Sequence, residues 1–222
     1  MNVLQKLIIR TLLRSIGKTY DGTGLSRENA HDTPFHLFAD WFQQALKESP
    51  DQANIMNLAS VSADGNPSAR LVLLKDFDEN GFVFYTNYHS RKGQELTANP
   101  NACLTFWWEK SFRQVRIEGE VDRVSAQESD AYFATRDRTS QLGAWASHQS
   151  RVVASRSVFE SKVAELDRHY QGRDVPRPPF WGGYRLAPSE IEFWQGRLNR
   201  LHDRFQYKRL ADGHWVMNRL AP

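Results

Sequence analysis

The stretch that decides the fold runs from residue 55 to residue 77, where IMNLASVSA (55–63) and ARLVLLKDF (69–77) flank the turn sequence DGNP (64–67). Both flanking runs are short and rich in apolar and branched residues, as β-strands are. Gly and Pro between two such runs mark a tight reversal of the chain. The stretch therefore predicts two consecutive antiparallel strands.

The strand pattern continues toward the C-terminus, at 82–87, 102–108, 112–124, 184–186, 191–195, 204–209 and 214–218. Short strands joined by turns are typical of an antiparallel sheet or barrel. Helical spacing and capping residues predict helices at 2–16, after Asp32-Thr33-Pro34, and at 90–98, 126–135 and 156–170. We therefore expect a mainly β (α+β) fold in a single domain, 1–222, made of an N-terminal helical segment (1–50), barrel strands (51–125), helices (126–172) and C-terminal strands (173–222).

The composition restricts the classes of function. The formal charge is only +3 and no basic run resembles a nucleic-acid tail, so we expect a small anionic ligand and no nucleic acid. Seven Trp, seven Tyr and thirteen Phe are enough to line a ring-binding site.

Cys103, the one cysteine, excludes an internal disulfide and a multi-cysteine zinc site, and it favours a reducing cytoplasm. Charged residues interrupt the apolar N-terminal stretch, so we expect no membrane span. That stretch, 2–16, is a basic amphipathic helix; we favour a structural role, and organelle targeting is the alternative.

Near the C-terminus, Phe193-Trp194-Gln195-Gly196 precedes two arginines and a histidine, Arg200, His202 and Arg204. Trp194 can cover a flat ring, and the arginines can bind phosphate or carbonyl oxygens. Alternation along a strand would place residues 200, 202 and 204 on one face. The cluster predicts a lined ligand pocket, with a solvated strand edge as the alternative.

Two further segments have the chemistry of phosphate sites. Ser90-Arg91-Lys92-Gly93 opens a helix, where free backbone N–H groups favour an anion. Tyr132 and Arg136 lie four residues apart, Ser140 follows just beyond the expected helix end, and Lys75 can add a charge. The alternatives are an exposed basic first turn for the first segment and a surface Tyr–Arg pair with a capping Ser for the second.

A heterocycle site is suggested by Gln114, which alternation places on the same side of its strand as Arg116. Gln149-Ser150 lies in a polar loop and indicates nothing by itself. The remaining histidines lack metal-ligand spacing, and there is no P-loop, HExxH or nucleophile elbow. We therefore expect no metal and no serine-hydrolase chemistry.

With these motifs in this order, the chain resembles the pyridoxine 5'-phosphate oxidase family from about Tyr20 to Pro222. The motifs that carry the resemblance are Arg70-Leu71-Val72-Leu73-Leu74-Lys75, Phe84-Tyr85-Thr86-Asn87, Ser90-Arg91-Lys92, Arg113-Gln114-Val115, Gln141-Leu142-Gly143-Ala144-Trp145, Phe180-Trp181-Gly182-Gly183, Glu192-Phe193-Trp194-Gln195-Gly196 and Arg200-Leu201-His202-Asp203-Arg204.

The resemblance implies a split β-barrel and a homodimer with FMN bound across the subunit interface. Arg200 and His202 would be the catalytic residues over the substrate ring, and Lys75, Tyr132, Arg136 and Ser140 would hold the substrate phosphate. FMN would be held, partly by residues of the partner chain and with Arg91 and Lys92 at its phosphate, by Arg70, Leu71, Val72, Leu73, Leu74, Lys75, Tyr85, Thr86, Arg91, Lys92, Gln114, Gln149, Ser150, Trp194 and Arg204.

Two positions depart from the family pattern. Tyr20 matches a substrate-binding position, but Gly17 stands where family members often carry an arginine, three residues before that tyrosine. The resemblance therefore does not decide whether the N-terminal segment covers the substrate as a lid. Asn57 stands where a small apolar or hydroxyl residue is usual. Neither change touches the flavin motifs.

The activity implied is oxidation of pyridoxine 5'-phosphate or pyridoxamine 5'-phosphate to pyridoxal 5'-phosphate, with O2 as acceptor, H2O2 as product and ammonia released from the amine. This reaction belongs to vitamin B6 biosynthesis and salvage. The alternatives are a split-barrel flavin enzyme with another substrate, a non-catalytic carrier of FMN or pyridoxal phosphate, and a basic nucleic-acid-binding barrel.

Overall fold

The structure is a computed structural model, and it describes residues 24–222. The expected first helix (2–16), Gly17 and Tyr20 lie outside the described residues. The elements are α2 (Pro34–Glu48), β1 (Ile55–Val61), β2 (Pro67–Leu73), β3 (Asp76–Asp78), β4 (Gly81–Asn87), α3 (Arg91–Ala98), β5 (Asn101–Trp108), β6 (Arg113–Arg123), α4 (Ala126–Ala134), α5 (Arg138–Ala146), α6 (Ser157–His169), β7 (Trp181–Gln195), the 3-10 helix η1 (Leu198–Arg200), β8 (Asp203–Arg209) and β9 (Trp215–Arg219).

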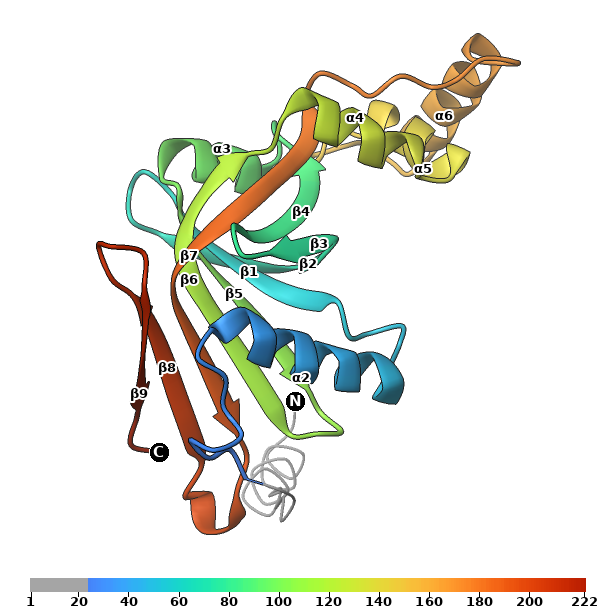
Figure 1. Ribbon diagram of the computed structural model, residues 1–222. Coiled ribbons are helices and arrows are strands. Elements are labelled where there is room, and N and C mark those ends of the chain that lie inside the picture. The colour runs from blue at the N-terminus through green and yellow to red at the C-terminus, as the bar shows by residue number, and fades with distance from the viewer. Residues whose placement is uncertain (1–23) are drawn as a thin grey trace, which may run out of the picture.

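The strands form one antiparallel sheet that curls into a split barrel (Figure 1). Its main path runs β2-β1-β5-β6-β7-β4-β3, with β8 paired to β7 and β9 to β8. The two ends of this path, β2 and β3, are separated along the chain only by Leu74 and Lys75. So short a connection spans at most about 11 Å. The ends of the sheet must therefore nearly meet, which confirms the expected mainly β split-barrel fold.

β7 is a single strand of 15 residues where two short strands were expected. Its first part pairs with β4 and its last part with β8, while β6 lies along both. A bulge in the β6–β7 pairing falls between Glu118 and Gly119, and a Cβ on Gly119 would lie 2.1 Å from the Ala187 carbonyl oxygen. Pro188, which has no N–H, is tolerated at such a bulge. The break in the apolar pattern is thus a bend, not the end of a strand.

The main core lies between the curled sheet and α2, which crosses it (Figure 1). Phe38 on α2 is fully buried, and its ring packs edge-on against Phe77, Phe82 and Phe106, with ring centroids 4.9–5.2 Å apart. The predicted aromatic stripe of this helix is therefore core. Pro34 occupies the first turn as expected, although the Thr33 side chain makes no capping hydrogen bond.

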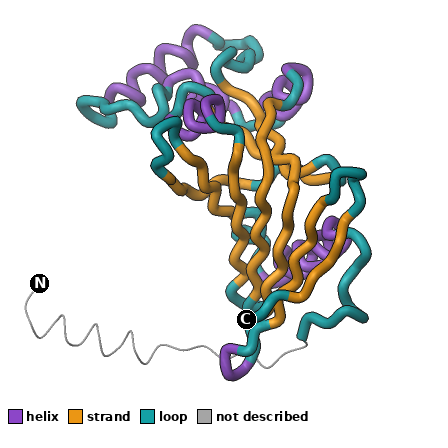
Figure 2. Tube along the Cα trace, turned by 90° about the vertical axis from the view of Figure 1, so that its left-hand side faces the viewer, coloured by secondary structure: helices purple, strands orange, loops and turns teal. Residues whose placement is uncertain are grey.

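A second, smaller core lies under α4, α5 and α6, which gather beyond one end of the strands (Figure 2). Phe133, Leu142, Leu166 and Trp181 pack there. The helices α4 and α6 match the expected ranges closely, but α5 was not expected. Asp137 begins α5, because its carboxylate accepts a hydrogen bond from the Ser140 backbone N–H at 2.8 Å. Ser140 follows the end of α4, as expected, and lies in the first turn of α5. Arg136, four residues after Tyr132, lies beyond the end of α4 instead of on the same helix, which corrects the expectation from their spacing.

Candidate functional site

A cavity of about 750 Å³ lies between β2, β4 and the α4–α5 pair. This volume is within the usual range of small-molecule sites. The cavity brings together most of the residues that the sequence proposed for phosphate and ring binding, from segments far apart in the chain: Leu71, Val72, Leu73, Lys75, Tyr85, Thr86, Lys92, Tyr132, Arg136, Ser140 and Gln149.

The first cationic part of the cavity lies at the start of α3. The Ser90 hydroxyl accepts a hydrogen bond from the Gly93 N–H and caps the helix. The Lys92 ammonium donates to Thr86 Oγ1 at 3.3 Å and to Gln149 Oε1 at 3.1 Å. Burial, and then the charge of Arg70, lower the pKa of Lys92. Lys92 is thus a partly desolvated cation beside a helix N-terminus, which suits an anion.

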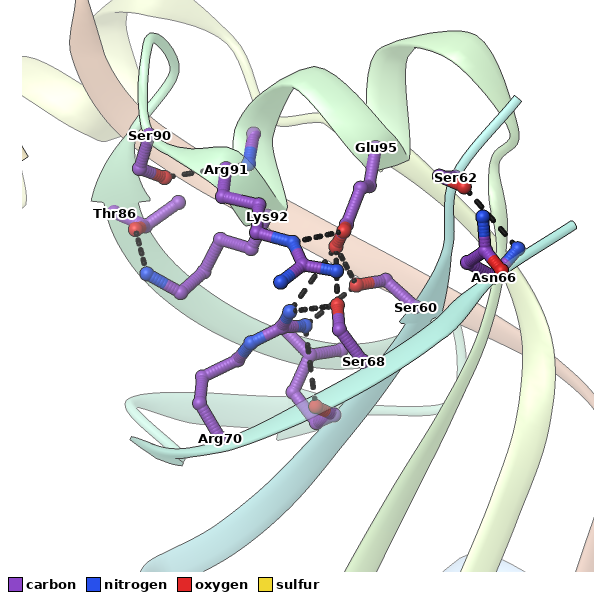
Figure 3. Close-up of polar contacts among 12 residues, drawn as sticks. Ser60, Ser62, Asn66, Ser68, Arg70, Thr86, Ser90, Arg91, Lys92 and Glu95 are labelled. Carbon is purple, nitrogen blue, oxygen red and sulfur yellow. Dashed lines mark hydrogen bonds and ion pairs between the residues drawn. The ribbon is translucent and has the colours of Figure 1, made fainter. Parts of the chain in front are cut away.

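Arg70 and Arg91 do not line the cavity; both guanidinium groups contact the carboxylate of Glu95, which is 5% exposed (Figure 3). Arg91 Nε lies 2.7 Å from Glu95 Oε1, and Arg70 Nη2 lies 3.0 Å from Glu95 Oε2. The hydroxyls of Ser60 and Ser68 each donate to the same Oε2 at 2.6 Å. Burial alone would favour the neutral acid, but these hydrogen bonds lower the pKa of Glu95 to about 2.

The second cationic part of the cavity is formed by Arg136, Tyr132 and Lys75. The Arg136 guanidinium lies over the Trp181 ring at 4.7 Å, and its Nη1 is buried with no hydrogen-bond partner among the described residues. Lys75 Nζ lies 5.9 Å from the centre of the Tyr132 ring. A buried donor without a partner is costly. An anion that accepted from Arg136 would remove this cost.

Tyr132 stacks on Tyr85 with ring centroids 3.9 Å apart. Burial, and then the nearby Glu128 carboxylate, raise the pKa of Tyr85 to about 12. The Tyr85 phenol therefore stays protonated at neutral pH and can donate a hydrogen bond. We call Lys75, Thr86, Lys92, Tyr132, Arg136 and Ser140 the cavity group.

The remaining predicted residues form a second set, which does not line this cavity. Gln114 on β6 is opposite Trp194 on β7, and Trp194 is opposite Arg204 on β8. The three side chains thus form a row across the sheet, on the face away from the buried Val115. Arg204 Nε donates to Glu192 Oε1 at 2.7 Å. We call Gln114, Trp194, Arg200, His202 and Arg204 the C-terminal group.

His202 packs against Trp194, with ring centroids 4.4 Å apart. Its Nδ1 accepts a hydrogen bond from the Arg197 backbone N–H at 3.1 Å, so the neutral ring carries its proton on Nε2. Burial, and then the positive charge of Arg200, lower the pKa of His202. This ring is therefore neutral at pH 7.

Arg200 does not share a strand face with His202 and Arg204, which corrects the expectation from alternation. It ends the 3-10 helix η1 with φ of +62°, following Asn199 at +57°. Two consecutive left-handed residues make a sharp turn before β8 begins at Asp203. Arg200 is consequently carried on a turn rather than on the sheet.

The structure places three other predicted site residues outside the cavity. Leu74 is 4% exposed and belongs to the core, so its side chain does not face the cavity. Ser150 follows Gln149 with φ of +69° but does not line the cavity. Gln114 was expected to point inward, whereas the fully buried residues of its strand are Val115 and Ile117.

Sequence reasoning gave no site role to Glu95, Asp137 or Trp181, although Trp181 belongs to one of the motifs that carry the family resemblance. Asp137 and Trp181 line the cavity, and Glu95 anchors the arginines beside it. Asp137 precedes Arg138-Thr139-Ser140, which is the signal of a helix cap. Glu95 stands four residues after Arg91, the spacing of a helical ion pair. Hydrogen bonds from Ser140 and Thr139 hold the pKa of Asp137 well below its usual range.

Two negative observations apply to residues 24–222. No group of three His, Cys, Asp or Glu side chains is arranged to hold a metal ion within that range. None of the helices described there is long and apolar enough to cross a membrane.

Family models match most of the chain. Residues 42–170 match the model described as pyridoxamine 5'-phosphate oxidase. Residues 181–222 match the pyridoxine 5'-phosphate oxidase C-terminal dimerisation region. That second range contains all of the C-terminal group except Gln114.

Curated relatives agree with these matches. A pyridoxine/pyridoxamine 5'-phosphate oxidase of Gloeothece citriformis is 55% identical over 95% of this chain and 98% of its own length. One of Microcystis aeruginosa with the same name is 56% identical over 89% of this chain and 92% of its own length.

Two solved structures are similar to the whole fold. PhzG from Burkholderia lata, in complex with tetrahydrophenazine-1-carboxylic acid, has a TM-score of 0.85 at 30% identity and covers 92% of this chain and 100% of its own. A pyridoxamine 5'-phosphate oxidase-related, FMN binding protein from Nostoc punctiforme has a TM-score of 0.69 at 16% identity, covering 87% of this chain and all of its own.

Proposed function

We propose that this chain, which belongs to the pyridoxamine 5'-phosphate oxidase family, binds FMN and oxidises the 4' carbon of its substrate at the cavity described above. Family membership makes it an oxidase of pyridoxine 5'-phosphate and pyridoxamine 5'-phosphate. The finer proposal is that O2 is the electron acceptor, that pyridoxal 5'-phosphate and H2O2 are the products, and that the amine also releases ammonia. The reaction would serve vitamin B6 biosynthesis and salvage.

The observation that carries the proposal is that one cavity has two separate cationic parts, one at Lys92 and one at Arg136. FMN and the substrate each carry one phosphate, so a site for both needs two such parts. Lys92 lies beside the N-terminus of α3, and Arg136 has a buried donor without a partner in the described chain. Both features fit a phosphate better than a neutral ligand.

The residues present fit FMN in a particular way. Lys92, with Arg91 and Arg70 nearby, would hold its phosphate, and Thr86 and Gln149 would add hydrogen bonds. The backbone of residues 71–73 and the Tyr85 ring would line its path through the cavity. Gln114, Trp194 and Arg204 are not in this cavity, so we propose that they contact FMN from the second chain of a homodimer. FMN would then lie at the subunit interface.

The substrate phosphate would be held by Lys75, Tyr132, Arg136 and Ser140. Arg200 and His202 would cover the pyridine ring from the partner chain. His202 is neutral with its proton on Nε2, so it can donate one hydrogen bond to a ring substituent. It adds no second positive charge beside Arg200. Arg200 can stabilise negative charge on the ring or on its 4' oxygen.

When bound, FMN supplies the two-electron redox chemistry. The side chains are therefore needed mainly to position the substrate carbon and to neutralise two phosphates. No described side chain is required as a strong base, in keeping with the Tyr85 phenol and the His202 ring being neutral at pH 7. A non-catalytic carrier of FMN or pyridoxal phosphate would need the cavity group but not Arg200.

A second candidate is oxidation of a phenazine-type carboxylic acid, because the Burkholderia lata structure holds such a ligand. That ligand carries a carboxylate but no phosphate. The relatives named for the phosphorylated substrates are about twice as similar to this chain in identity. Together with Arg136 and Ser140 in the cavity, this favours the phosphorylated substrates.

The test is to add pyridoxine 5'-phosphate anaerobically to the FMN-loaded protein and to follow the visible absorbance of the flavin. The proposal predicts bleaching that reverses when O2 is admitted, with one H2O2 formed for each flavin that is reoxidised. Unphosphorylated pyridoxine at the same concentration is the control and should bleach far more slowly. A bound flavin that no phosphorylated B6 vitamer bleaches would refute the proposal in favour of a carrier.

The cellular compartment is proposed as a reducing cytoplasm. Burial raises the pKa of the Cys103 thiol, so this residue is a poorly reactive packed thiol rather than half of a disulfide. A fluorescent fusion of the full chain would locate it directly.

A further inference from the structure

Glu95 on α3 contacts two cations near the start of that helix, Arg70 of β2 and Arg91 of α3, and its charge also acts on a third, Lys92. Glu95 lies almost fully buried on α3, and its oxygens accept from Ser60 on β1, Ser68 on β2 and both Arg70 and Arg91. In Figure 3 the guanidinium groups of Arg70 and Arg91 lie against this carboxylate, while the Lys92 side chain extends from the same end of α3 toward Thr86. Nothing in the chemistry proposed above uses it.

The charges of this cluster match those of a phosphate monoester. Arg70, Arg91 and Lys92 are positive and Glu95 is negative, which leaves about two positive charges. A phosphate monoester carries about 1.5 to 2 negative charges at neutral pH. Without Glu95 the cluster would hold three cations close together in a partly desolvated place, and their mutual repulsion would oppose a fixed arrangement.

The geometry also fixes Arg91. Its Nε donates to Glu95 at 2.7 Å, while the side chain is 61% exposed and otherwise extends into solvent. A guanidinium anchored through Nε still presents both Nη groups to a ligand. Arg70 is anchored in the same cluster by Ser60, Ser68 and the Leu58 carbonyl oxygen. Glu95 therefore holds the arginines beside Lys92 before any ligand arrives.

We propose that Glu95 is a positioning residue that pre-arranges Arg91 and Arg70 for the flavin phosphate, and so makes the site select FMN over riboflavin. The inference rests on the proposed function, because it assumes that FMN is the ligand. It assigns a role in cofactor selection to a residue that need not touch the cofactor.

A purely structural role is the competing explanation. Glu95 joins α3 to the β1–β2 hairpin, and such a tie could serve stability alone. The two explanations differ in what they predict for the phosphate. A structural tie affects FMN and riboflavin alike, whereas a positioning role affects only the ligand that carries the phosphate.

The experiment compares the dissociation constants of FMN and riboflavin, from quenching of flavin fluorescence, for wild-type apoprotein and the Glu95→Gln variant. The proposal predicts that FMN binds about tenfold more weakly to the variant. This is the loss expected when charge-assisted hydrogen bonds from a positioned arginine to the phosphate are weakened. Riboflavin binding should change less than about twofold. The matched control is Glu160→Gln, which removes an exposed Arg156–Glu160 pair of the same i,i+4 spacing and should change neither constant.

Equal weakening of both ligands, or unchanged or tighter FMN binding, would overturn the proposal. The Arg91→Ala variant and its combination with Glu95→Gln provide a second readout. If Glu95 acts through Arg91, the two losses in FMN affinity will be clearly less than additive, and full additivity would contradict the role. If Glu95→Gln fails to fold, Ser68→Ala removes one bond to the carboxylate and should lower only FMN affinity, by about two- to threefold. Failure of wild type to bind FMN would refute the proposed function as well.

Discussion

The cavity group and the C-terminal group differ in how much of a site one chain supplies. The cavity group lies in a formed pocket, where Lys92, Thr86 and Gln149 already contact one another and Tyr132 stacks on Tyr85. The C-terminal group lies on the outer face of β6–β8 and on an exposed turn, where Leu201 is 67% exposed. The comparison teaches that one chain forms a cationic pocket by itself but leaves the C-terminal group without one, which is why we propose that a second chain completes the site. The C-terminal dimerisation region covers nearly all of the C-terminal group.

The largest effect should come from the C-terminal group. Arg200→Ala should lower kcat by about 100-fold or more, because a positioned charge over the reacting ring is lost. The FMN content should stay that of wild type, since Arg200 is not in the cavity. Turnover measured with pyridoxine 5'-phosphate, with flavin content from absorbance, checks both. Leu198→Ala in the same turn is the matched control, and a normal kcat in Arg200→Ala would remove this residue from catalysis.

A smaller effect is expected in the cavity group. Lys92→Met should weaken FMN binding by about tenfold, because a cation beside a helix N-terminus is replaced by an apolar side chain of similar length. Turnover at saturating FMN should change much less. Fluorescence titration gives the affinity, with exposed Lys47→Met as control. A fall in saturated turnover with unaltered affinity would reverse the roles assigned to the two groups.

The titration of His202 sharpens the account of the C-terminal group. Burial, and then Arg200, lower its pKa, so removing the Arg200 charge should raise that pKa, while burial keeps it below the ordinary 6.5. The Arg200→Ala variant should thus show His202 becoming protonated at higher pH than in wild type. Imidazole NMR signals, assigned with a His202→Gln variant, measure this shift. An unchanged or lower pKa would mean that the two side chains are not close in solution.

The mildest effect concerns acid stability. The folded pKa of Glu95 is about 2, below its ordinary 4.5. Its stabilising contribution is therefore complete above about pH 4.5 and is lost as the pH falls toward 2. The difference in free energy of unfolding between wild type and Glu95→Gln should shrink across this window. Urea unfolding at pH 7 and pH 3.5 tests this, and a difference that stays constant would show that the carboxylate is not held ionised.

Much of the fold followed from the sequence, because alternation and turn residues are local signals. The strand ranges from 55 to 124 were close to those observed, except that the expected strand 69–77 is divided into β2 and β3 at Leu74 and Lys75. The helix at 156–170 was within one residue at each end. The sequence did not show that β7 is continuous, because Pro188 interrupts the strand pattern. Its tolerance depends on the bulge opposite Gly119, which is a property of two strands that meet from distant segments.

The site was predictable as a list of residue types but not as an arrangement. Lys92 and Arg136 were found because cations near helix ends and aromatic rings are visible along the chain. Strand alternation placed Arg200 wrongly, because two left-handed residues form a turn that no periodicity signals. Glu95 was missed because its four partners come from β1, β2 and α3, and only the folded barrel brings them together.

The most direct test of the central claim is to purify a mixed dimer of one Arg136→Ala chain and one Arg200→Ala chain, each with its own tag. If every site combines a cavity group from one chain with a C-terminal group from the other, one of the two sites in the mixed dimer is intact. The account predicts about half of the wild-type activity, although both parent dimers are nearly inactive. A mixed dimer as inactive as its parents would show that each chain completes its own site.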